Sequence, residues 1–114
     1  MYNEIIESIE FKTKEVQSLI FELKQVKSNL GAKNLKTKEI VEMFVEAEMI
    51  ADKIVTNYKE VMSERSSSYH YCEDLNGCLN NFELEQGVQE KKKQFIKEVK
   101  EAEKVMNEIR NREF

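Results

Sequence analysis

The chain has 114 residues, with 18 Lys and Arg against 22 Asp and Glu, so its net charge is -4. This length suits a single domain, and the whole chain, 1–114, is expected to form one. With no Pro, no Trp, only 3 Gly and 35% charged residues, the composition excludes collagen-like, Pro-rich and turn-dense β-sheet chains and favours long helices.

The first segment, residues 2–30, carries apolar residues in a seven-residue register. Such a register is typical of helices that pack side by side along their length. Five residues form one row, and three more lie three positions later: Tyr2, Ile9, Val16, Leu23 and Leu30, then Ile5, Leu19 and Val26. The pattern predicts one long helix over 2–30.

A short interruption follows at Gly31-Ala32-Lys33-Asn34. Gly31 stands where a left-handed C-terminal cap is expected, and Asn34 where an N-cap is expected. We therefore predict a tight turn that makes the first two helices antiparallel neighbours. The alternative is one helix that continues through Gly31, because an isolated Gly costs a helix only ~1 kcal/mol.

The second predicted helix covers residues 35–64 and has the broadest apolar face of the three. Its seam is expected to alternate by three and four residues: Ile40, Phe44, Ala47, Ala51, Ile54, Tyr58 and Val61. Val41, Val55 and Met62 flank this seam on one side, and Met43 and Ile50 on the other. Because a wide apolar face is normally buried, this helix is expected to be the most buried one.

The helical pattern fails over residues 65–77, which contain three consecutive serines and the turn dipeptide Asn76-Gly77. We predict a loop here. A third helix follows over 78–112, because Val88, Phe95, Ala102 and Ile109 recur every seven residues.

Three long helices of similar length predict an all-α fold, either an antiparallel helical bundle or a coiled-coil hairpin that is completed by oligomerisation. No apolar run approaches the ~18 residues of a membrane span, and the N-terminus lacks a secretory signal. A cytoplasmic protein is expected, with export without a cleaved signal as the alternative.

Residues suited to metal binding occur in one place, at His70, Cys72 and Cys78. Their types fit zinc, but their spacing does not supply the two close pairs that a tetrahedral site requires. We expect ordinary thiols, no metal and no cofactor. One His beside one Cys also defines no nucleophile and base, so no catalytic residue is assigned and the chain is expected not to be an enzyme.

Lysines are dense in the third helix, at Lys91, Lys92, Lys93, Lys97, Lys100 and Lys104. The triplet 91–93 wraps around a helix because successive residues point about 100° apart. Neighbouring glutamates also dilute the positive charge. Together with the acidic balance of the chain, this makes nucleic acid an unlikely partner.

Several apolar residues lie outside the inward rows and are candidates for an interface. Phe11 and Phe21 fall off the main seam of the first helix, and Met43, Ile50 and Met62 flank the seam of the second. Uncovered aromatic and aliphatic side chains favour association. The protein is therefore expected to bind a partner, to self-associate, or both.

These observations favour a non-catalytic helical interaction protein: an adaptor, a chaperone or a small inhibitor, of bacterial, phage or mobile-element origin. The pair of long helices joined at Leu30-Gly31-Ala32 also resembles, in architecture, the small helical partners of bacterial type VII secretion effectors. The chain has no Trp for that family's Trp-x-Gly turn, and Tyr69 and Glu73 match its aromatic-x-x-x-acid signal in spacing alone. A small metal or thiol protein that uses residues 70–78 is the third alternative.

Overall fold

The structure, a computed structural model, describes the backbone of residues 2–63 and 75–113, and side chains at 4–63 and 86–113. Three helices make up its regular structure: α1 (Tyr2–Leu30), α2 (Thr37–Ser63) and α3 (Leu75–Arg110). The predicted all-α class, with three helices packed against one another, is confirmed. The predicted segments were 2–30, 35–64 and 78–112, so α3 begins inside the segment predicted as a loop over 65–77.

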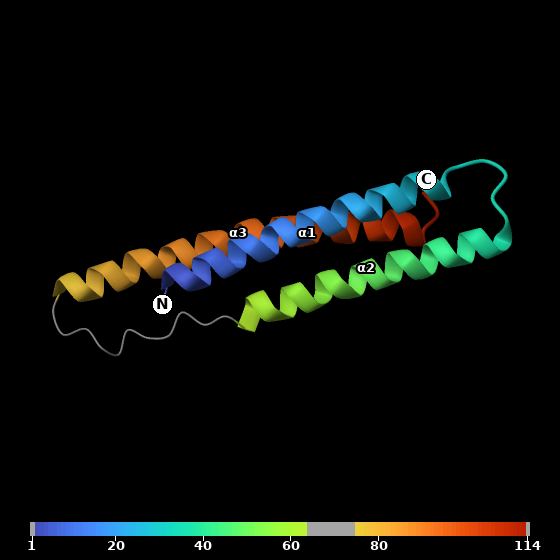
Figure 1. Ribbon diagram of the computed structural model, residues 1–114. Helices are drawn as coiled ribbons and strands as arrows, with labels where there is room; N and C mark the ends of the chain where they lie inside the picture. Colours follow the sequence, from blue (N-terminus) through green and yellow to red (C-terminus); the bar gives the residue numbers. More distant parts are fainter. Residues whose placement is uncertain (1, 64–74, 114) are drawn as a thin grey trace.

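The helices lie side by side in an elongated bundle of 68 × 18 × 16 Å (Figure 1). α1 and α3 run in the same direction next to each other, and α2 lies along one side of this pair and runs in the opposite direction. The Cα radius of gyration is 18.9 Å, well above the ~13 Å of a compact chain of this length. No helix in the described part of the chain is long and apolar enough to cross a membrane.

α1 and α3 are held in one parallel register along most of their shared length. Glu10 pairs with Lys91 at 2.9 Å, Gln17 donates to Glu98 at 3.2 Å, and Lys27 pairs with Glu108. In each case the α3 partner stands 81 residues after its α1 partner. A constant offset requires the two helices to run parallel without slipping, so the polar contacts fix which apolar residues meet.

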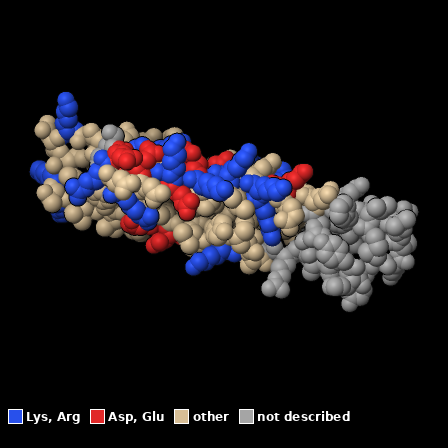
Figure 2. All heavy atoms as spheres, turned by 180° about the vertical axis from the view of Figure 1, so that it is seen from behind, with Lys and Arg blue, Asp and Glu red and all other residues tan. Residues whose placement is uncertain are grey.

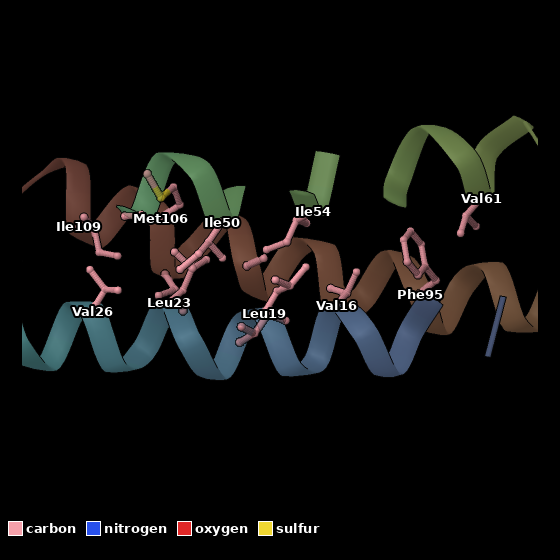
Figure 3. Close-up of a cluster of buried hydrophobic side chains, with 14 of the residues drawn as sticks. Val16, Leu19, Leu23, Val26, Ile50, Ile54, Val61, Phe95, Met106 and Ile109 are labelled. Atoms are coloured by element: carbon pink, nitrogen blue, oxygen red, sulfur yellow. The ribbon is translucent and has the colours of Figure 1, made fainter. Parts of the chain in front are cut away.

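The core contains most of the seven-residue rows predicted from the sequence, together with Ile20, Ile50 and Val105, which lie outside those rows. Val16, Leu19, Leu23 and Val26 of α1 point toward Phe95, Met106 and Ile109 of α3, with Ile50, Ile54 and Val61 of α2 closing the third side (Figure 3). The fully buried side chains include Ile9, Val16, Leu23, Val61, Val88, Phe95 and Ile109. Burying side chains of this size is worth about 1.5–3 kcal/mol each.

α2 differs from its predicted pattern. Its central row of Ala47, Ile54 and Val61 is buried as predicted, but Ile50 and Asn57 are buried beside it, while Tyr58 is 40% exposed. The Asn57 amide donates to the Lys53 carbonyl one turn earlier, which satisfies its polar group inside the core. The flank with Ile50 and Asn57 is buried more deeply because α2 packs more closely against α1 than against α3.

The expectation that α2 is the most buried helix is wrong. Four aliphatic side chains on its outer surface are about half exposed or more: Val41, Val45, Met49 and Val55. α1 and α3 make the most extensive helix–helix contact, and α2 packs on this pair from one side. Its broad apolar face therefore exceeds what the two neighbours can cover.

The connection between α1 and α2 is a short linker, so the alternative of one continuous helix is excluded. Gly31 does not adopt a left-handed conformation; that role falls to Asn34, with φ of 67°. The Gly31 amide still donates to the carbonyls of Lys27 and Ser28. The amide of Ile40 donates to the carbonyl of Lys36, so Lys36, and not Asn34, precedes the first turn of α2.

The C-terminal end of α3 closes with a Schellman motif. Glu113 donates to the carbonyl of Glu108 at 2.8 Å, and Arg112 donates to that of Ile109 at 3.1 Å. Arg112 adopts the left-handed conformation, with φ of 57°, which is the conformation this motif requires. The motif ends the helix at Arg110, two residues before the predicted end.

The core predicts the response to truncation of its largest buried side chain. Phe95 is fully buried, so Phe95→Ala should lower the free energy of unfolding by about 3–5 kcal/mol, measured by urea denaturation. Phe21→Ala is the matched control, because Phe21 is 64% exposed and its loss should change stability by about 0.5 kcal/mol or less. Equal effects of the two substitutions would contradict this packing.

Candidate functional site

No metal-binding cluster is assembled in the described part of the chain. No cluster of three or more His, Cys, Asp or Glu side chains among these residues is placed to hold a metal ion. His70 and Cys72 lie outside the described residues. Cys78 belongs to the first turn of α3, where side chains are not described.

The five residues predicted to form an interface are divided between the surface and the core. Phe11 and Phe21 are 69% and 64% exposed, so both aromatic rings are accessible on α1. Met43 and Met62 are partly buried against the core. Ile50, at 5% exposed, belongs to the core, where it is covered by α1.

The most apolar of the concave surfaces is an open groove between α2 and α3. It exists because these two helices pack least closely of the three pairs. Its volume is about 420 Å³, and it runs along the two helices instead of forming an enclosed cavity. We call it the α2/α3 groove.

Apolar side chains dominate the α2/α3 groove. Core residues form its floor, among them Leu23, Ile54 and Met106. α2 contributes Ala51, Val55 and Tyr58 to one side, and α3 contributes Ile96 and Val99 to the other. Val55 remains 48% exposed. The sequence predicted that Ala51 and Tyr58 belong to the core seam. Ala51 is partly buried against the core and also lines the groove, whereas Tyr58 is 40% exposed.

An ion pair across the groove joins Glu48 of α2 to Arg110 of α3. The guanidinium donates from Nε to Oε1 at 3.0 Å and from Nη2 to Oε2 at 3.1 Å. Such a two-point contact fixes orientation as well as distance. The hydrogen bonds lower the pKa of the Glu48 carboxyl and raise that of Arg110. The pair therefore ties α2 to α3 at one end of the groove.

A second hollow lies between α1 and α2. Its volume is about 330 Å³, and it is lined by Phe21 and Met49 at the surface and by Val26 and Ile50 at its base. Phe21 and Met49 are both exposed. Polar residues, including Glu22, Glu46 and Lys53, make up much of the remaining lining. This hollow is a less apolar candidate than the α2/α3 groove.

Four lysines of α3 share one exposed face. Lys93, Lys97, Lys100 and Lys104 are separated by four, three and four residues, the spacing of a single helical stripe. Sequence reasoning noted correctly that the triplet 91–93 wraps around the helix, but it missed this stripe, although the spacing alone reveals it. Figure 2 shows Lys and Arg side chains along the rear face of the bundle, with Asp and Glu side chains among them.

The glutamates expected to dilute these lysines are partly engaged elsewhere. Glu101 pairs with Lys24 at 3.6 Å, and Glu98 accepts a hydrogen bond from Gln17 at 3.2 Å. Glu108, which lies farther along α3, pairs with Lys27. The hydrogen bond from Lys27 lowers the pKa of the Glu108 carboxyl. No ion pair among the described residues involves any of the four stripe lysines. The stripe is therefore a positive surface on a chain of net charge -4.

Comparisons with known proteins gave no match. No family model, curated protein or solved structure matches the chain.

The Glu48–Arg110 pair predicts a pH dependence of stability. Because the folded-state pKa of Glu48 is lowered from 4.5, the pair stabilises the fold above that pH and loses its effect as the pH falls further. Glu48→Gln should cost about 0.2–1 kcal/mol at neutral pH, as expected for an exposed pair. The difference from the parent should shrink as the pH falls below 4.5 through the lowered pKa of Glu48, measured by urea denaturation across the pH range.

Glu42→Gln is the control for this series, because Glu42 is exposed on the same helix and no ion pair of the described residues involves it. A Glu48→Gln deficit that stays constant down to the lowest pH would contradict an electrostatic role for the pair.

Proposed function

We propose that this protein is a non-catalytic interaction module whose principal docking site is the α2/α3 groove. The observation that carries the proposal is the groove itself, which has an apolar lining and a volume of about 420 Å³ and is open along two helices. Amphipathic helices commonly bind in apolar grooves of this kind. An adaptor, a chaperone and a small inhibitor are all compatible with such a site.

Exposed apolar side chains on α2 support the same proposal. Val55 and Tyr58 line the groove and are 48% and 40% exposed. Burial of these apolar side chains against a partner would be favourable, because it would remove them from water. Exposed apolar residues that form a continuous surface mark interaction sites more often than single scattered ones do. A second copy of the chain and a different protein would both satisfy this proposal.

Site-specific photocrosslinking in the source cells tests the docking site. A benzophenone amino acid at position 55 lies in the groove, whereas the same group at position 56 lies outside it, because Thr56 is an exposed α2 residue that does not line the groove. We expect a discrete covalent adduct from position 55 and none from position 56, detected by gel shift and identified by mass spectrometry.

The same experiment at Phe21 examines the hollow between α1 and α2. An adduct at position 21 with none at position 55 would move the docking site to that hollow. No adduct at either position would contradict an interaction function for both surfaces.

A further inference from the structure

The two sides of the α2/α3 groove differ in charge. On the α3 side, Lys100 lines the groove, and Lys93 stands one heptad earlier on the same helical row. Glu103 is the one carboxylate among the described α3 residues that line the groove. On the α2 side, the lining residues Ala51, Ile54, Val55 and Tyr58 carry no charge. Within the lining, Glu103 offsets Lys100, so net positive charge along the α3 edge comes from the stripe lysines that lie beyond the lining.

Arg110 does not supply additional free positive charge, because Glu48 neutralises it. The remaining positive charge comes from the stripe, in which Lys93, Lys97, Lys100 and Lys104 extend over about three turns of α3. Of these, Lys104 also interacts electrostatically with Glu108. Because they repeat at helical spacing, they match carboxylates that repeat at the same spacing along a neighbouring helix. A nucleic acid backbone would be attracted by the lysines but would gain nothing from the apolar groove beside them.

The dimensions of the groove also suit a helix. Its α3 lining extends from Ile96 to Arg110, which corresponds to about 20 Å or four helical turns. Two helices with an open seam between them offer the position that a fourth helix occupies in a four-helix bundle. An extended strand would find no partners there for its backbone N–H and C=O groups, because the backbone groups of α2 and α3 are already hydrogen-bonded within their own helices.

We propose that the ligand of the α2/α3 groove is an amphipathic helix of another protein, with an apolar face seated between α2 and α3 and an acidic flank lying along the lysine stripe of α3. This inference rests on the proposed function and specifies the chemical class of its partner. The bound helix completes a four-helix bundle and covers Val55, Tyr58 and Val99. The lysines orient the bound helix by attracting its acidic flank, and they make its association with the groove fast and dependent on salt concentration.

A second copy of the chain is a less suitable occupant. The outward face of α2, with Val41, Val45 and Met49, is the most apolar helix face that a copy could offer. Apart from Val55, the outer face of α2 lies outside the groove, so a copy that docked this face into a neighbour's groove would leave its own groove free and the assembly would not close. A separate helix fills the groove once and leaves a complex of defined size.

An unbiased selection with the purified full-length chain tests the partner's chemistry. The probe is a yeast-displayed library of helical peptides of about 20 residues, with Leu, Ile, Val or Ala on one face and Glu, Gln, Lys or Ser elsewhere. We expect enrichment of peptides with glutamates along one flank of the apolar face. Their affinity should fall as salt concentration rises, because exposed charges are screened.

Two matched pairs of variants locate the binding. Val55→Lys places a charge in the groove, and Val45→Lys places the same charge on an equally exposed α2 position outside it. We expect the first to weaken peptide binding by about tenfold or more and the second by about twofold or less. Lys100→Glu should weaken it by about fivefold or more, whereas Lys14→Glu on the exposed surface of α1 should not.

The possible failures are distinguishable. Selected peptides that lack acidic residues but lose binding in Val55→Lys would overturn the charge assignment and leave the groove as a docking site. Peptides that bind Val55→Lys as well as the parent, or no enrichment at all, would overturn this inference together with the groove as a docking site.

Open-ended association in light scattering that Val55→Lys abolishes would assign the groove to a second copy. Equal binding of duplex DNA by the parent and Val55→Lys, lost in Lys100→Glu, would assign the stripe to nucleic acid.

Discussion

The parallel register between α1 and α3 is the constraint on which the rest of the bundle depends. Polar pairs at Glu10–Lys91, Gln17–Glu98 and Lys27–Glu108 repeat the same offset of 81 residues. These contacts are exposed or half-buried, so each contributes little to stability. Their importance lies in alignment: a slip of one residue would remove all of them and would carry Phe95 and Ile109 away from their partners. The apolar rows supply the free energy, and the polar contacts select the register.

The position of α2 follows from that pairing. Once α1 and α3 have buried their main rows against each other, α2 can pack closely against only one of them, and it packs more closely against α1. Ile50 and Asn57 are buried on that side, while Ala51, Val55 and Tyr58 border the open seam with α3. The groove and the exposed apolar face of α2 are therefore two results of the same asymmetry. Glu48 and Arg110 tie the seam at one end without closing it.

The sequence predicted the helices and the rows of α1 and α3 because a seven-residue apolar repeat has a single interpretation there. α2 was harder, since apolar residues stand on both flanks of its central row. Two flanks of α2 could be the buried one: the flank with Met43, Ile50 and Asn57, or the flank with Phe44, Ala51 and Tyr58. Because Asn57 is polar, the sequence favours the second flank, whereas the structure buries Ile50 and Asn57. Which flank is buried depends on how closely α2 packs against α1 and against α3, which is a property of the tertiary structure. The lysine stripe could have been recognised from spacing, but the engagement of Glu101 and Glu108 by α1 depends on tertiary structure.

Amide hydrogen exchange resolved by residue tests the central claim, that α1 and α3 form the stable pair and α2 is the more weakly held helix. The account predicts that amides in the middle of α1 and α3 exchange only through global unfolding. Amides in the middle of α2 should open at a distinctly lower free energy, with Asn57 and Ile54 among those showing it. Equal protection of all three helices, or an α2 more protected than α1, would contradict the account.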